Sequence, residues 1–204
     1  MSSATCIAES TRNISILTAT AASIAPPHHH SKRKTASGAI REAVVIDGLN
    51  VFFASRQSPK FENVLAIAAD VIANDYDLYC VFDASTRYTV RDRQGSQHVK
   101  AYLHLLEHFS NLFIETTGGS CADEVILNLA EMYDARIISN DRYRDWINDF
   151  HFLTDRNRVI RVNTFKDILF VGKQRLRVDS DLRTAMSKLE ELMSSQFLKL
   201  ERLG

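Results

Sequence analysis

The chain has 204 residues, of which 45% are hydrophobic and 25% are charged, enough to bury one core of roughly 100 to 150 residues. Its 25 basic and 25 acidic residues cancel, which excludes a protein that coats nucleic acid along its whole surface but allows local basic patches. The cysteines Cys6, Cys80 and Cys121 are widely spaced and form no C-x-x-C pair, which argues against a disulfide framework or a structural zinc site. We therefore expect a protein of a reducing, intracellular compartment, the cytoplasm.

Residues 1–40 differ in composition from the rest of the chain, because they are rich in Ser, Thr and Ala and contain a single acid, Glu9. Such a segment lacks the apolar residues that a core needs, so we expect a disordered tail. Its partly apolar stretch 14–24 is too short to span a bilayer, which argues against a membrane protein. The stretch also lacks the charged start of a signal peptide, and an organelle-targeting segment is the minor alternative.

From residue 41 onward, apolar runs typical of strands alternate with segments of helical period. The predicted strands are 43–46, 78–82, 111–115 and 135–139, and the predicted helices between them are 61–74, 97–109 and 122–133. Strands separated by helices of ten or more residues predict a parallel sheet with right-handed crossovers. The expected fold class is α/β, a three-layer α/β/α sandwich with a central, mainly parallel sheet, in a domain of residues 41–178.

The end of the chain contains a different pattern. Two short apolar runs on either side of Gly172 and Lys173 predict a β-hairpin. The C-terminal segment 179–204 predicts a helix with an apolar stripe in alternating four-three spacing, formed by Leu182, Met186, Leu189, Met193, Leu200 and Leu203. This stripe either pairs with a second copy as a coiled coil, which makes a homodimer, or packs on its own domain, and the sequence favours neither outcome.

Three of the predicted strands run into an aspartate, namely Asp47, Asp83 and Asp141. Because ligands of an open parallel sheet bind beyond the carboxyl ends of its strands, we expect these acids to converge. Asp123 follows a glycine-rich turn at the start of a helix, and Asp145 comes one turn after Asp141. Carboxylates that converge without matching lysines suit a hard divalent cation, Mg²⁺ or Mn²⁺.

Such an acidic set has a chemistry of its own. Cleavage of a phosphodiester bond needs charge neutralisation, a deprotonated water and a stabilised leaving oxygen, and one or two cations held by carboxylates supply all three. We assign Asp47, Asp123 and Asp141 to metal binding, directly or through water, Asp145 to orienting a water, and Asp83 to the rim or to a second metal. For Asp123 there is a plainer alternative, because a helix N-terminus favours an acid by roughly 0.3 to 1 kcal/mol without any ligand.

Three blocks of the sequence together resemble a known family. They are VIDGLNV at 45–51, ADEVIL at 122–127 and SNDRYRD at 139–145, and they look like the signature blocks of the NYN branch of PIN-like ribonucleases, in particular the Regnase-type domain. The likeness extends over about residues 41–165. It implies a PIN-like fold and a metal-dependent nuclease that acts on single-stranded or looped RNA, with Asp47, Asp123, Asp141 and Asp145 as the acidic set.

Two departures from that family's pattern matter. The Regnase-type domain often has adjacent aspartates in the second block, whereas this chain has Ala122 before Asp123, which removes one carboxylate that Asp83 would replace. The chain also has no C-x-C-x-C-x-H zinc finger, so any targeting that such a finger supplies is absent.

Substrate contacts are expected from basic residues around the acidic set, namely Arg87, Arg91 and Arg144. Asn50 either binds a phosphate oxygen or fixes Asp47, or it is only a turn residue after the strand. The segment 156–177 holds seven basic residues against Asp167 alone, a local charge of +6 that predicts salt-dependent, sequence-independent phosphate binding. The alternative is that these bases form the solvent face of a hairpin.

The sequence can be compared with three functions from different classes. A metal-dependent ribonuclease, with an endoribonuclease as its favoured form, explains the acidic set. A non-catalytic RNA-binding or scaffold protein with the same fold would be expected to lack an acid. A haloacid-dehalogenase-like phosphatase normally needs a second aspartate two positions after the first, where this chain has Leu49.

Overall fold

The computed structural model describes residues 41–55, 58–166 and 168–201, and the side chains of this range as far as residue 196. The predicted disordered tail, 1–40, lies outside the described residues. Among the described helices, none is both long and apolar enough to cross a membrane.

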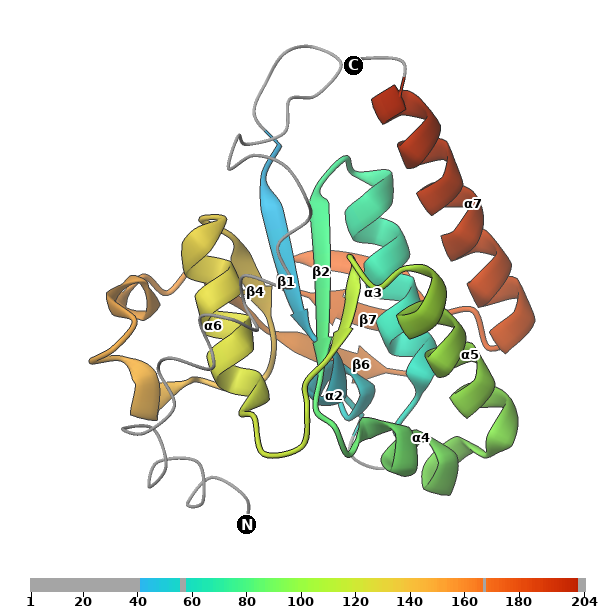
Figure 1. The fold of residues 1–204 in the computed structure, drawn as a ribbon, viewed down its shortest axis with the longest axis horizontal. Coiled ribbons are helices and arrows are strands. Elements are labelled where there is room, and N and C mark those ends of the chain that lie inside the picture. The colour runs from blue at the N-terminus through green and yellow to red at the C-terminus, as the bar shows by residue number, and fades with distance from the viewer. Residues whose placement is uncertain (1–40, 56–57, 167, 202–204) are drawn as a thin grey trace. The chain divides into compact units, whose positions relative to one another are not determined.

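A five-stranded sheet forms the centre of the domain (Figure 1). Its strands lie in the order β3-β2-β1-β4-β5, and every neighbouring pair is parallel. The four predicted strands are present, although the predicted 111–115 and 135–139 are shorter than expected, and β5 was not predicted. The bounds are β1 (Ala43–Asp47), β2 (Asp77–Phe82), β3 (Phe113–Glu115), β4 (Arg136–Ile138) and β5 (Val159–Ile160).

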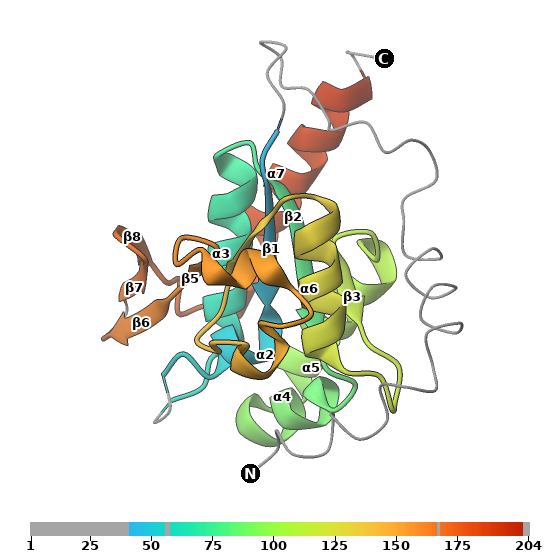
Figure 2. The ribbon, with the colours of Figure 1, turned by 90° about the vertical axis from the view of Figure 1, so that its left-hand side faces the viewer.

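Helices cover both faces of this sheet, as a parallel sheet requires. Figure 2 shows α3 (Phe61–Ala73) and α6 (Ala122–Met132) on opposite sides of β1 and β2. The predicted three-layer α/β/α sandwich is therefore confirmed. The remaining elements before residue 155 are α2 (Gly48–Phe52), α4 (Thr86–Gln94), α5 (Ser96–His108) and the short 3-10 helices η1 (Arg144–Trp146) and η2 (His151–Thr154).

A second, three-stranded antiparallel sheet follows, in the order β6-β7-β8. Its strands are β6 (Val162–Phe165), β7 (Ile168–Val171) and β8 (Gln174–Arg177). The hairpin predicted around Gly172 is thus β7 and β8, and β6 extends it. The inner face of the sheet belongs to the core through Val162, Leu169 and Val171.

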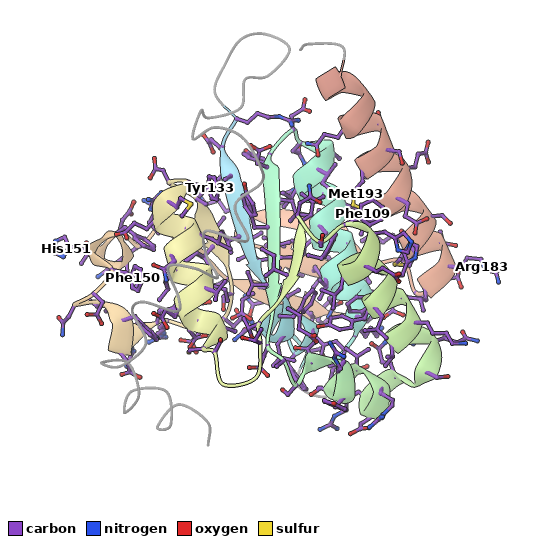
Figure 3. All side chains as sticks on the ribbon, viewed as in Figure 1. Phe109, Tyr133, Phe150, His151, Arg183 and Met193 are labelled. Carbon is purple, nitrogen blue, oxygen red and sulfur yellow. The ribbon has the colours of Figure 1, made fainter. Side chains whose placement is uncertain are left out.

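The last helix, α7 (Leu182–Glu201), packs against α3. Ala185, Leu189 and Met193 are buried, and they belong to the same core cluster as Leu65 and Phe82. Figure 3 shows Met193 on the inner side of α7, while Arg183 points outward. The described part of the apolar stripe therefore packs on its own domain and is not free to form a coiled coil; Leu200 and Leu203 lie outside the described side chains.

Candidate active site at the carboxyl edge of the parallel sheet

Four of the five predicted acidic residues meet at the carboxyl edge of the parallel sheet. Asp47 is the last residue of β1, Asp83 follows β2, Asp141 follows β4, and Asp123 lies in the first turn of α6. Burial and then the charges of Asp47, Asp141 and Asp83 raise the pKa of Asp123 to about 6. Asp123 therefore lies near enough to the other three acids for their charges to act on it, as expected for side chains at neighbouring strand ends.

Asp47 is the buried anchor of this group, with 8% of its surface exposed. Its carboxylate accepts hydrogen bonds from the Asn50 N–H at 3.0 Å, from the Ser139 hydroxyl at 2.9 Å and from the Tyr143 hydroxyl at 3.1 Å. Burial raises the pKa of Asp47, and the charge of Asp141 adds to the effect, while the three hydrogen bonds oppose it. Two loops from different parts of the chain thus fix one carboxylate.

Gly48 explains how the chain turns directly from Asp47 into α2. A Cβ atom at this position would lie 2.2 Å from Cε1 of the Phe82 ring, far inside any real contact. Phe82 is itself buried and meets the Tyr102 ring edge-on, with centroids 5.0 Å apart. Only glycine lets the end of β1 lie this close to β2.

Tyr143 is a site residue that the sequence reasoning missed. Its backbone has φ +46°, in the left-handed region that costs energy for a residue with a Cβ, and its N–H donates to Asp141 Oδ1 at 2.7 Å. This turn directs the ring inward, so that only 2% of the residue is exposed and its hydroxyl reaches Asp47. The local sequence carries no signal for this contact, because the partner lies 96 residues away.

The loop that contains Asp141 is tied down on both sides. Asn50 accepts the Asn140 N–H through Oδ1 at 2.9 Å, and the Asp141 N–H donates to the Ser139 hydroxyl oxygen at 2.9 Å. Asn140 in turn pairs with the backbone of Val162, accepting its N–H at 3.0 Å and donating to its carbonyl at 2.7 Å. Asn50 therefore holds the loop of Asp141 through its side chain and contacts Asp47 through its backbone N–H, and its predicted contact with substrate stays a prediction.

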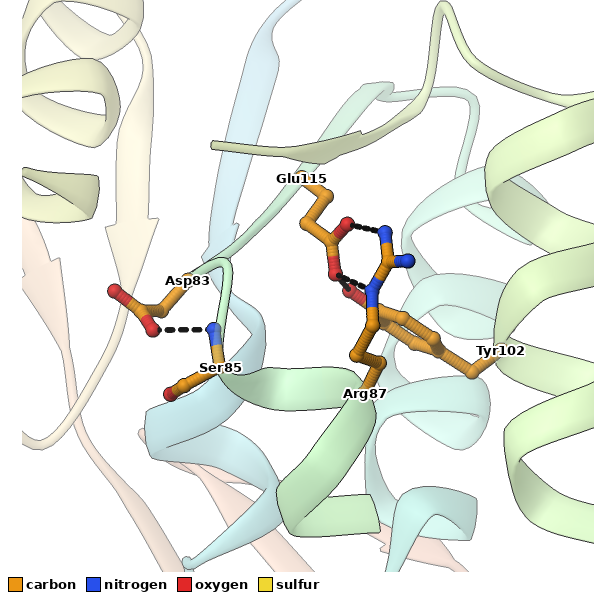
Figure 4. Close-up of polar contacts among 5 residues, drawn as sticks. All are labelled: Asp83, Ser85, Arg87, Tyr102 and Glu115. Atoms are coloured by element: carbon orange, nitrogen blue, oxygen red, sulfur yellow. Dashed lines mark hydrogen bonds and ion pairs between the residues drawn. The ribbon is translucent and has the colours of Figure 1, made fainter. Parts of the chain in front are cut away.

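On the other side of the site, Asp83 accepts the Ser85 N–H at 2.7 Å (Figure 4). Nearby, Glu115 at the end of β3 accepts the Tyr102 hydroxyl at 2.7 Å and Nε of Arg87 at 3.2 Å, and it also pairs with the second guanidinium nitrogen. Glu115 raises the pKa of Arg87. Arg87, predicted to contact substrate, thus neutralises a fourth strand-end carboxylate, Glu115, which the sequence reasoning did not include.

The remaining predicted residues lie outside this network. Asp145 and Arg144 are exposed on η1, and Asp145 is not among the charges that act on Asp123. Arg91 is exposed on α4, with its guanidinium 5.5 Å from the centre of the Tyr88 ring. The roles assigned to these three residues stay predictions.

The donor set decides which metal would fit. Within the part of the chain that the structure describes, no three His, Cys, Asp or Glu side chains lie close enough together to hold a metal ion by themselves. Mg²⁺ does not require such a cage, since it keeps several waters and binds through one or two carboxylates. Carboxylate oxygens such as those of Asp47, Asp83, Asp123 and Asp141 are the donors that a hydrated Mg²⁺ or Mn²⁺ takes, and metal binding by these residues stays a prediction.

Comparisons with known proteins identify a family for this chain. No curated protein matches the chain significantly. Two solved structures of a nuclear protein-only RNase P, PRORP2 from Arabidopsis thaliana, are similar to it at 16% and 15% identity, each with a TM-score of 0.49. They cover 64% and 68% of this chain, which spans only 29% of either of theirs. The model of the Zc3h12a-like ribonuclease NYN domain matches residues 40–191, more than half of the chain, so this protein belongs to that family of ribonuclease domains, as its three sequence blocks predicted.

Proposed function

We propose that this protein is a divalent-metal-dependent endoribonuclease that hydrolyses phosphodiester bonds in single-stranded or looped RNA. The observation that carries the proposal is the electrostatic coupling of Asp123 with Asp47, Asp141 and Asp83 at one sheet edge. The charges of three neighbouring carboxylates raise the pKa of Asp123, which is costly for the fold, and such clusters mark functional sites. Membership of a ribonuclease family supports RNA as the substrate.

A bound Mg²⁺ or Mn²⁺ would supply charge neutralisation for the phosphate and a water of lowered pKa. The carboxylates of Asp47, Asp123 and Asp141 would hold this ion directly or through water. Ser139, Tyr143 and Asn50 keep Asp47 fixed by hydrogen bonds, and Asn140 keeps the loop of Asp141 against β6. A site held this way needs little rearrangement during the reaction, which is how fixed charges contribute to catalysis.

The scaffold alternative predicts RNA binding without turnover. It would be favoured by loss of an acid from the cluster, and the structure brings four together. The comparison that separates the two functions is therefore between wild-type protein and a variant that removes one charge but leaves every backbone contact. Asp141→Asn is such a variant, because the amide oxygen of Asn can still accept the Tyr143 N–H.

The test uses a circular single-stranded RNA with a stem-loop, incubated with Mg²⁺, with Mn²⁺ or with chelator. A circle has no ends, so any cut is internal. Glu131→Gln serves as the matched control, because it also removes one negative charge but lies on α6, eight residues from Asp123, about 12 Å along the helix.

We expect metal-dependent linearisation by the wild type and by Glu131→Gln, and a loss of roughly a hundredfold or more in Asp141→Asn. Cutting of linear RNA alone would show an exonuclease. If the wild type and Asp141→Asn both bind RNA in a salt-dependent way and neither cuts it under any condition, the catalytic proposal would be overturned in favour of the scaffold.

A further inference from the structure

The second sheet has two chemically different faces, which its register defines. Val162, Val171 and Gln174 lie opposite one another, as do Thr164, Leu169 and Leu176. This inner face is attached to α3, since the Gln174 amide donates to both carboxylate oxygens of Asp70 at 2.8 Å. Because side chains alternate along a strand, the outer face carries the other set, formed by Asn163, Phe165, Ile168, Phe170, Arg175 and Arg177.

Aromatic rings and cations are paired on this outer face. The Arg175 guanidinium lies 5.6 Å from the centre of the Phe170 ring, its direct cross-strand neighbour. The Lys166 ammonium lies 5.7 Å from the Phe165 ring. Phe165 is 64% exposed, the largest fraction among the exposed large apolar residues of the described chain. An exposed ring contributes little to the packing of its own domain. Together with the cation beside it, the ring can bind a ligand that carries both a planar group and a negative charge.

The structure also divides six of the seven basic residues of 156–177 into two groups. Arg158 pairs with Asp134, and Arg161 donates to the carbonyl of Asn140, so these two stabilise the fold. The exposed basic residues on or next to the outer face are Lys166, Lys173, Arg175 and Arg177. Asp167 is the single acid of the segment. The predicted patch is therefore smaller than its sequence charge, but it coincides with the aromatic residues.

From this arrangement we infer that the outer face of β6, β7 and β8 binds the single-stranded RNA substrate outside the acidic site. A base stacks on Phe165, and the guanidinium groups of Arg175 and Arg177 bind phosphates. The inference rests on the proposed ribonuclease function for the identity of the ligand. Charge complementarity favours RNA over a protein partner. Proteins bind single-stranded nucleic acids without sequence preference through aromatic side chains that alternate with lysine and arginine residues.

The position of the face suits this role. Asn140, next to Asp141, pairs with both backbone groups of Val162, the first residue of β6. Phe165 is three residues further along the same strand, about 10 Å away. A strand of RNA that leaves the acidic edge along β6 therefore reaches Phe165 within a few nucleotides.

The test measures binding separately from cleavage. Fluorescence anisotropy follows a labelled oligouridylate of about 12 nucleotides on the full chain carrying Asp141→Asn, with chelator present and the salt concentration varied. Phe165→Leu keeps apolar bulk without a ring, and Phe165→Trp restores a ring. Arg175→Gln with Arg177→Gln removes two charges, and Arg183→Gln, on the outer side of α7, is the control that removes a base elsewhere.

We expect Phe165→Leu to weaken binding about tenfold and Phe165→Trp to restore it. The slope of log K against log salt is negative, and the double arginine variant should reduce its magnitude by about 1.4, whereas Arg183→Gln should leave it unchanged. With Asp141 intact, Phe165→Leu should raise KM and keep kcat.

Unchanged affinity in Phe165→Leu and an unchanged slope in the double variant would overturn the inference. A fall in mass by light scattering on Phe165→Leu would also overturn it, because the face would then join two copies of the chain. If the variants weaken RNA binding as expected but the wild-type protein does not cleave RNA, the proposed catalysis would be contradicted. The inference that this face binds RNA would still hold.

Discussion

The carboxyl edge of the parallel sheet and the outer face of the antiparallel sheet are one loop apart, yet they present opposite charges. The first gathers Asp47, Asp83, Asp123 and Asp141, and the second displays Arg175 and Arg177. Helices cover both faces of the parallel sheet, so polar groups are free only where its strands end. The antiparallel sheet is covered on one face alone, so every second residue of its strands is available. The two kinds of sheet thus place functional residues differently, and each prediction below tests one side of this contrast.

The largest difference in cleavage activity is expected between the variants Asp47→Asn, at the acidic edge, and Arg177→Ala, on the outer face. Asp47 is buried and its pKa is raised, so removing its charge relieves repulsion, but the amide oxygen of Asn replaces only one of the two carboxylate oxygens that accept hydrogen bonds. We expect cleavage to fall roughly a hundredfold or more, with a loss of stability to urea of no more than about 1 to 3 kcal/mol in the metal-free protein. Arg177→Ala should change stability by less than about 0.5 kcal/mol, since the residue is exposed.

Activity assays and urea unfolding of the same preparations check this pair. The contrast fails if Asp47→Asn keeps full cleavage, or if it unfolds the protein.

The acidic edge should also make the stability of metal-free protein depend on pH. The pKa of Asp123 rises from 3.8 to about 6 in the fold, so between these values the native state holds a proton that the unfolded state releases. The free energy of unfolding therefore falls as pH rises from about 4 to about 6, by at most about 3 kcal/mol. Asp123→Asn should remove this component and be the more stable protein above pH 6.

Unfolding of both proteins in chelator across this range gives the difference directly, with Glu131→Gln as control. Parallel pH curves for wild type and Asp123→Asn would show that the carboxylates do not interact as described.

The connection between the two regions can be cut with Asn140→Ala. This change leaves the N–H and carbonyl of Val162, a residue only 1% exposed, without their partners, which we expect to cost about 1 to 3 kcal/mol. Cleavage and RNA affinity should both fall, because the loop of Asp141 and the start of β6 lose their common attachment. Asn157→Ala, at an exposed position before β5 and outside the outer face, is the control. Equal stability of Asn140→Ala and wild type would argue against this coupling.

The smallest effect is expected from Tyr143→Phe. It removes one hydrogen bond to Asp47, which still accepts from Asn50 and Ser139, so the loss of stability should be about 1 kcal/mol. Loss of a supporting partner of a ligand residue typically costs tenfold or more in activity, and we expect a decrease of about tenfold in kcat with KM unchanged. A rise in KM alone would place Tyr143 in substrate binding.

Several features of this protein were predictable because they depend on neighbours in sequence. Apolar runs indicated β1, β2 and β4, and each run ended in an aspartate that the parallel order then placed at one edge. Helix α4 was not predicted, since only Thr86 and Val90 of its nine residues are buried and the apolar period is weak. The stripe on α7 was visible, but whether a second copy or α3 covered it was not.

The sequence by itself determined the type of most elements, the family, and four of the acids near the carboxyl edge of the sheet, because strand ends and periodicities are local properties of the chain. Tertiary structure alone decided that Ser139 and Tyr143 hold Asp47, that Arg87 serves Glu115, and that Arg158 and Arg161 stabilise the fold while Arg175 and Arg177 face outward. These outcomes depend on register and on contacts across as many as 96 residues. A shift of one residue in a strand reverses which side chains face the solvent, so composition fixes the charge of a segment but not the direction in which it points.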